Sequence, residues 1–130
     1  MSLVHAVLLL SVGACAMASK APCVPDSRPL PEHFLIRADT SAPGTIRGVI
    51  RQLRDSQAIK SVIVRTTEGS RQTTTNDLGY FELTGVPTGS VTLHVALIGY
   101  YPATVPVELP EQNGVILLGF LGWSCPQWVF

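Results

Sequence analysis

The sequence is poor in charge, and its charged residues form no cluster that would suit a polyanionic partner. Only 14% of the 130 residues are Asp, Glu, Lys or Arg, with nine basic and nine acidic, and the formal net charge is zero. A nucleic-acid-binding domain normally carries a basic patch or stripe. Here the basic residues are scattered between Lys20 and Arg71. The composition therefore argues against nucleic acid as a partner.

Motifs for catalysis and for metal binding are missing as well. The chain contains no H-E-x-x-H or H-x-x-E pattern, no C-x2-C pair and no G-x-S-x-G elbow. These patterns mark zinc sites and hydrolase nucleophiles. The loop glycines lack the following helix that a phosphate site needs. We therefore expect no enzyme activity, no cofactor and no bound metal.

Long hydrophobic runs are also lacking. The run from Leu3 to Val12 is about ten residues long, which is too short to span a bilayer as a helix. Small residues follow it, a pattern typical of a secretory signal peptide, although no Lys or Arg precedes it. Two cleavage sites compete. Ala16-Met17-Ala18 would end a signal peptide at residue 18, whereas V-G-A-C resembles a lipobox, with a signal of residues 1–14 and lipidation at Cys15.

Either cleavage predicts an exported protein, which would be periplasmic, anchored to the outer membrane or extracellular. Contact with a membrane would come only through a lipid on Cys15. The three cysteines then leave Cys23 and Cys125 as a pair, and an oxidising compartment favours a disulfide between them. Such a bond would join the N-terminal arm to the C-terminal end and stabilise the fold by up to about 4–5 kcal/mol. Two unpaired thiols are the alternative.

Residues 19–44 are rich in proline, which removes backbone donors and favours extended geometry. We expect an extended arm or tether, with a short strand at His33–Ala38 as its one regular element. From residue 45 the pattern changes to short apolar runs separated by Gly, Asn, Asp and Pro. Alternation within the runs is typical of strands that bury one face. The expected strands are 45–50, 59–66, 71–75, 79–83, 90–98, 103–109 and 114–122.

These runs predict an all-β fold, a single seven-stranded Greek-key-like sandwich over residues 45–121, followed by an aromatic tail, residues 122–130. The run Val115–Leu121 is apolar throughout, which favours a buried last strand. If it did not pair inside the sandwich, it would be an exposed edge for strand addition.

Several segments together resemble the carboxypeptidase regulatory-like domain: G-V-I at 48–50, T-N-D-L-G-Y-F-E-L at 75–83, V-P-T-G-S-V-T-L-H-V at 86–95 and I-G-Y at 98–100. The resemblance covers about residues 45–109. It implies a transthyretin-like β-sandwich of the carbohydrate-binding-like fold group, which also occurs at the N-terminus of TonB-dependent receptors. Lys60-Ser61 departs from the small Gly-Ala pair common in the family. The residues that match its turns and core are Gly48, Asn76, Gly79, Phe81, Pro87, Gly89, Gly99 and Tyr100.

Aromatic residues near the C-terminus are the candidates for binding. Exposed Tyr and Trp side chains stack on sugar rings or anchor protein partners. Trp123 and Trp128 flank Cys125, and Tyr101 follows the I-G-Y motif. We select these three aromatic residues as candidate binding residues.

The expected function is that of a non-enzymatic domain of the bacterial cell envelope. It would act as a structural or protein-interaction module, accessory or regulatory, whose partner is an envelope protein or a polysaccharide. One alternative is a small carbohydrate-binding module. Another is a remnant of the N-terminal extension of a TonB-dependent receptor.

Overall fold

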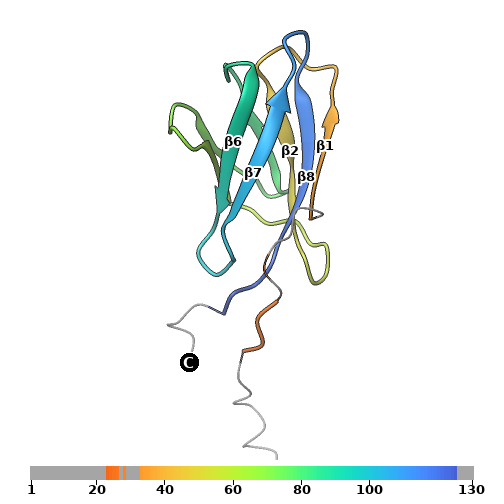
Figure 1. The fold of residues 1–130 in the computed structure, drawn as a ribbon. Coiled ribbons are helices and arrows are strands. Elements are labelled where there is room, and N and C mark those ends of the chain that lie inside the picture. Colours follow the sequence, from red (N-terminus) through yellow and green to blue (C-terminus); the bar gives the residue numbers. More distant parts are fainter. Residues whose placement is uncertain (1–22, 27, 29–32, 126–130) are drawn as a thin grey trace, which may run out of the picture.

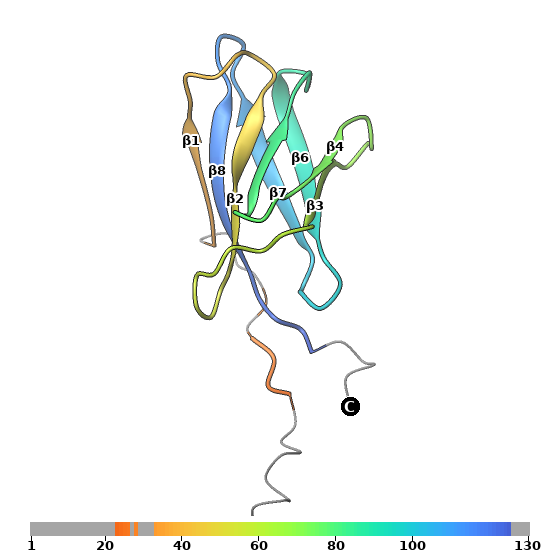
Figure 2. The same cartoon turned by 180° about the vertical axis from the view of Figure 1, so that it is seen from behind.

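Eight strands pair into two four-stranded sheets that face each other (Figures 1 and 2). The computed structural model describes residues 23–26, 28 and 33–125. The first sheet has the order β1-β8-β2-β5 and the second β4-β3-β6-β7. The strands are β1 (Phe34–Ala38), β2 (Ile46–Gln52), β3 (Ile63–Thr66), β4 (Gln72–Thr74), β5 (Tyr80–Leu83), β6 (Gly89–Ala96), β7 (Ala103–Leu109) and β8 (Val115–Leu121).

The predicted all-β sandwich is confirmed, with one strand more than the seven expected. The additional strand is β1, which lies in the proline-rich segment and pairs antiparallel with β8 over all five of its residues. Phe34 and Ile36 on its inner side pack against the core. The sandwich therefore starts at residue 34 instead of residue 45. The expected signal peptide, Cys15 and Trp128 lie outside the described residues.

The core is almost entirely aliphatic because each long strand turns alternate residues inward. In β2, Ile46 and Ile50 are fully buried, and in β8 the buried set includes Leu117 and Leu121. Phe81 is the one aromatic side chain among the buried hydrophobic residues of the described chain. Burial of this set is the main favourable contribution to folding. Across the described residues, no helix has the length and apolar character that a membrane crossing requires.

Strand β8 occupies an interior position in the first sheet. It pairs antiparallel with β1 on one side and parallel with β2 on the other. The alternative of an unpaired, exposed edge at Val115–Leu121 is therefore wrong. The expected last strand, paired inside the sandwich, is what the structure has. The run is apolar on both faces: Leu117 faces the core, whereas Ile116 is 38% exposed on the outer face.

The expected strand at 59–66 is shortened to β3 because Ser61 interrupts it. Ser61 has a φ of 67°, a left-handed conformation that few non-glycine residues adopt, and this residue breaks the alternation. As a result Ile59 and Val62 are both buried. Thr75 compensates for the lost pairing, since its Oγ1 accepts the Val62 N–H at 2.9 Å and donates to the Ile59 carbonyl at 2.7 Å.

The close approach of β2 and β8 depends on Gly48. A Cβ at this position would collide with the carbonyl oxygen of Leu117 and would lie 3.1 Å from the ring of Phe81. The backbone of Gly48 therefore fills the space between the neighbouring strand and the one buried aromatic ring. Glycine in a strand often marks such an approach.

We predict that Gly48→Ala lowers the free energy of unfolding by about 3 kcal/mol, because the new methyl group forces β2 and β8 apart. Gly69→Ala is the control: its Cβ would meet nothing within 4 Å, although its φ is 80°. In Gly69→Ala the left-handed backbone conformation alone should lower the free energy of unfolding by about 1 kcal/mol. Chemical denaturation of both variants measures the difference. Equal losses would contradict the steric role of Gly48.

Candidate functional site

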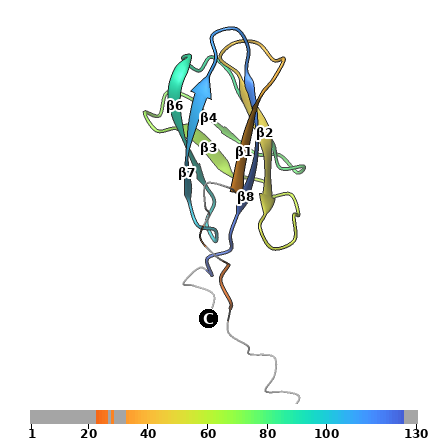
Figure 3. The ribbon, with the colours of Figure 1, turned by 45° about the vertical axis from the view of Figure 1, so that its right-hand side comes forward.

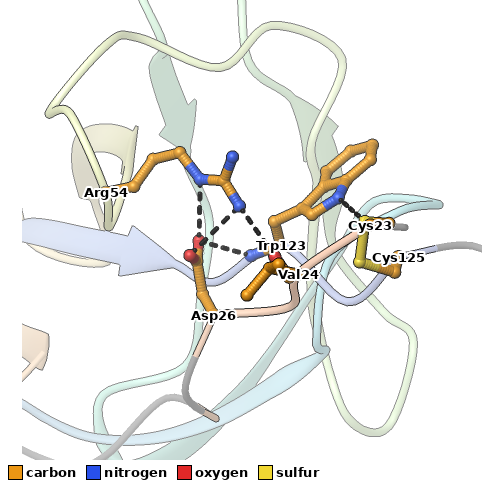
Figure 4. The surroundings of a disulfide bond; sticks show 6 residues. All are labelled: Cys23, Val24, Asp26, Arg54, Trp123 and Cys125. Atoms are coloured by element: carbon orange, nitrogen blue, oxygen red, sulfur yellow. Dashed lines mark hydrogen bonds and ion pairs between the residues drawn. A yellow bond between two sulfur atoms is a disulfide. The ribbon is translucent and has the colours of Figure 1, made fainter. Parts of the chain in front are cut away.

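The two ends of the described chain are joined at one end of the sandwich. Cys23 and Cys125 form a disulfide bond in the structure, with their Cα atoms 5.9 Å apart and a sequence separation of 102 (Figure 4). The backbone of the arm runs beside the segment that follows β8. We call the group Cys23, Asp26, Arg54, Trp123 and Cys125 the terminal clasp.

Hydrogen bonds inside the terminal clasp hold the arm in place. The Asp26 N–H donates to the Trp123 carbonyl at 2.7 Å, and the Trp123 N–H donates to Asp26 Oδ2 at 2.9 Å. Arg54, from the turn after β2, forms an ion pair with Asp26 at 3.2 Å. The hydrogen bond from the Trp123 backbone, helped by Arg54, lowers the pKa of Asp26. The arm is thus attached by polar contacts as well as by the disulfide.

The aromatic residues near the terminal clasp largely contact one another. Trp123 packs edge-on against Tyr100 with ring centroids 5.4 Å apart, and its indole N–H donates to Cys23 Sγ at 2.9 Å. Arg28 lies over the ring of Tyr101, 5.5 Å from its centroid. The structure therefore brings Trp123 and Tyr101 to the same end of the sandwich. Both are partly buried, and much of their surface already serves internal packing.

Asn76 and Gly79, which match the family motif, fix the backbone conformation of the turn before β5 through hydrogen bonds. Asn76 Oδ1 accepts the N–H groups of Leu78 and Tyr80 at 2.9 and 3.0 Å. Gly79 has a φ of 74° and donates its N–H to the Asn76 carbonyl, while its own carbonyl accepts the Ile50 N–H at 2.8 Å. This turn therefore positions β5 against β2.

The other motif residues lie apart from one another. Phe81 is buried in the core, and Pro87 is exposed. Gly89 and Gly99 have positive φ values of 106° and 99°. Tyr100 is partly buried, and this burial raises the pKa of its hydroxyl. Nothing in this set converges on a common binding site.

A surface that the sequence analysis did not select lies on the outer side of the first sheet. The strand register places Leu35, Leu118, Val49 and Tyr80 in one row across all four strands. In the second sheet, the corresponding register gives a row of Gln72, Arg65, His94 and Thr104. The first row is apolar up to Tyr80, and the second is polar throughout. These two rows therefore differ in chemistry, whereas the adjacent rows, Arg37-Ile116-Arg47-Glu82 in the first sheet and Thr74-Ile63-Ala96 in the second, are mixed.

Two shallow hollows lie on this outer face. One, of about 260 Å³, lies between β1 and β8. The other, of about 670 Å³, lies beside β2 and is bordered by the turn around Asn76 and the loop after β2. Leu35 is 50% exposed and Leu78, at the rim of the second hollow, is 75% exposed. We call the outward side chains Leu35, Arg37, Arg47, Val49, Arg51, Tyr80, Ile116, Leu118 and Phe120 the outer apolar face. Glu82, the register partner of Arg47, is exposed at its border.

Three arginines border the outer apolar face, and only one of them forms an ion pair within the described residues. Arg47 is bound to Asp39 at 2.7 Å, and this guanidinium lowers the pKa of Asp39 from 3.8 to about 2. Arg51 is exposed and donates to the Ser56 carbonyl at 3.1 Å. Arg37 is exposed at the edge of the sheet. Apolar side chains bordered by arginine are typical of protein-binding surfaces.

The sequence carries one signal for this face. The apolar run of β8 predicts burial, but alternate residues of a strand point to opposite faces. Ile116, Leu118 and Phe120 therefore had to face outward once β8 paired on both sides. Among the described residues, no group of His, Cys, Asp and Glu is arranged to hold a metal ion. The chemistry that this face offers is apolar contact and charge pairing.

Comparison with known proteins gives one family match. The model of the carboxypeptidase regulatory-like domain matches residues 45–117. No curated protein matches the chain.

Two solved structures are similar in fold. They are crystal structures of a C-terminal and an N-terminal interface mutant of a type II cohesin–X-dockerin complex from Acetivibrio cellulolyticus. Identity is 15% and 17%, the TM-score is 0.46 for both, and each match covers 56% of this chain and 56% of the other. The match thus spans little more than half of those chains, and similarity at this level carries no argument about function.

The Asp39–Arg47 ion pair predicts a specific loss of stability in acid. Because the pKa of Asp39 is lowered in the folded state, its contribution is present above the ordinary pKa and is lost as pH falls from about 4 to about 2. Asp39→Asn should make the pH dependence of unfolding shallower in that window. Asp77→Asn, at an exposed turn residue outside both ion pairs of the described chain, is the control. Identical pH profiles for the two variants would contradict this role.

Proposed function

The chain belongs to the carboxypeptidase regulatory-like domain family, and on this premise we propose that it is an exported, non-enzymatic protein-interaction module of the cell envelope. The outer apolar face is its recognition surface. The single observation that carries the proposal is the contrast between one outer row of each sheet. One presents a row of Leu35, Leu118 and Val49 that ends at Tyr80, and the other presents a polar row.

The chemistry of the outer apolar face favours a protein over a polysaccharide. Its centre consists of branched aliphatic side chains from β8 and β2, which lack the flat faces that stack on sugar rings. Its two aromatic residues, Tyr80 and Phe120, lie on different strands, at the end of the apolar row and near the end of β8. Arginine at the border is common at protein interfaces. The aromatic residues best suited to sugars, Trp123 and Tyr101, are engaged with Tyr100 and Arg28. The surface therefore supports a polysaccharide ligand less well than a protein partner.

Export is supported by the terminal clasp and by the apolar run near the N-terminus. Disulfides persist in oxidising compartments and are rare in the cytosol. The bond between Cys23 and Cys125 lies at the base of the arm, so the arm would leave the domain from a fixed point. Because most prolines of the proline-rich segment lie between Cys23 and β2, only the residues before Cys23 would then be available as a tether between the domain and its attachment in the envelope.

Photo-crosslinking in the producing cells tests the recognition surface. A photoreactive amino acid at Ile116 should crosslink one defined envelope protein, because this residue lies 38% exposed on the outer apolar face. The same amino acid at Thr104, exposed on the second sheet, is the matched control. Crosslinks from Thr104 alone, or retention on polysaccharide without a protein crosslink, would contradict the proposal.

Mass spectrometry of the intact protein from its native cells tests export. We expect a chain that starts at Ser19, or at an acylated Cys15. Thiol-alkylating reagent should add to Cys23 and Cys125 only after reduction. An uncleaved chain from the cytosol whose two cysteines are alkylated without reduction would contradict export.

A further inference from the structure

Strand β1 leaves an open edge on the first sheet, next to the outer apolar face. It is the terminal strand of its sheet and pairs only with β8 in the described part of the chain. The Asp39 N–H donates to the Gly114 carbonyl at 3.0 Å, and antiparallel ladders alternate between bonded and non-bonded positions. Leu35 and Arg37 therefore direct their backbone groups to β8, whereas those of Ile36 and Ala38 point to the open edge.

The other sheet ends are less suitable for a further strand. β7 ends the second sheet on the same side of the sandwich (Figure 3), but Pro106 in its middle lacks an N–H donor. β4 and β5, the two remaining ends, have three and four residues and lie against each other at the opposite side. β1 contains no proline, and its one charged residue is Arg37. Charged residues and proline usually protect edge strands, but a partner strand with carboxylates would be attracted by Arg37.

The charge at this edge selects the kind of strand that would fit. Arg37 is exposed and takes part in neither of the two ion pairs found among the described residues. It also lines the hollow between β1 and β8, together with Leu35 and Ile116. A partner strand that carries carboxylates would pair with Arg37 on the outer side. Its apolar residues would lie beside Phe34 and Ile36 at the edge of the core.

A second copy of this chain is less well matched to the edge. In an antiparallel pairing of two β1 strands centred on Ile36, Arg37 of one copy would face Leu35 of the other. Because β1 has no Asp or Glu, the pairing would bring no carboxylate to either Arg37. A strand of different sequence satisfies the charge, and self-pairing leaves it unbalanced.

We propose that the open edge of β1 receives an extended segment of a partner protein, with alternating apolar and acidic side chains, as a fifth strand of the first sheet. This inference rests on the proposed interaction function and names the chemistry of the partner. Main-chain hydrogen bonds to Ile36 and Ala38 would supply affinity, and Arg37 would supply selectivity. The added strand would extend the outer apolar face beyond Leu35.

The test uses a blocked peptide, acetyl-Val-Glu-Val-Glu-Val-Glu-Val-amide, and the disulfide-bonded protein. Amide hydrogen exchange should slow at Ile36 and Ala38 when the peptide binds, and stay unchanged at Leu35 and Arg37, whose amides are already paired with β8. In antiparallel addition the valines that lie opposite Ile36 and Ala38 direct their N–H groups to β1. A peptide with proline in place of its third and fifth residues, both valines, should therefore not produce this pattern, because proline removes these donors. Protection elsewhere on the protein, or none at millimolar peptide, would overturn the proposal.

Charge reversal at the edge provides the second arm of the test. Arg37→Glu should weaken binding of the Val-Glu peptide about fivefold and strengthen binding of the matching Val-Lys peptide. Arg65→Glu, on the outer side of the second sheet, is the matched control and should leave both affinities unchanged. Equal effects of the two variants would overturn the role of Arg37.

Sedimentation and native crosslinking distinguish strand addition by a partner from self-association of this chain and from the proposed interaction function. A dimer of the peptide-free protein that protects Ile36 and Ala38 would show that a second copy occupies the edge, and would overturn the proposal. If the peptide fails while crosslinks from Ile116 persist, strand addition is rejected and the interaction function stands. If the crosslinks from Ile116 are absent as well, both are rejected.

Discussion

The position of β8 between β1 and β2 is the constraint on which the rest of the structure depends. This strand, the last of the described residues, pairs parallel with β2 and antiparallel with β1. It therefore joins β1 to the rest of the first sheet. Gly48 allows the approach, because any side chain there would strike the Leu117 carbonyl. The same placement brings the segment after β8 alongside the N-terminal arm, where Cys23 and Cys125 meet.

The sequence allowed the fold class to be predicted because alternation and turn residues are local signals. The turn at Asn76 and Gly79, for example, follows from side-chain and backbone preferences that act within a few residues. β1 was foreseen only as a short strand in the arm, since its place in the sheet depends on β8, far away in sequence. The break at Ser61 was missed because Thr75, from another segment, satisfies the backbone there.

The candidate site was less predictable than the fold. Trp123 and Tyr101 were selected for their residue type, yet their rings contact Tyr100 and Arg28 within the chain. The outer apolar face could not be selected because the direction of Ile116 and Leu118 depends on which strands flank β8. The proposed recognition surface thus depends on the position of β8, because this strand joins β1 to β2 and also contributes Ile116 and Leu118 to the outer apolar face. Fold alone assigns no role, and the argument for binding comes from this surface.

Amide hydrogen exchange of the free, disulfide-bonded protein tests the placement of β8 most directly. The account predicts that all amides from Val115 to Leu121 exchange among the slowest of the protein, because alternate N–H groups donate to β1 and to β2. If every second amide of β8 instead exchanged at the rate of exposed turns, β8 would be an edge strand. β1 would then lie outside the sheet, and the outer apolar face would lose its border at Leu35 and Arg37.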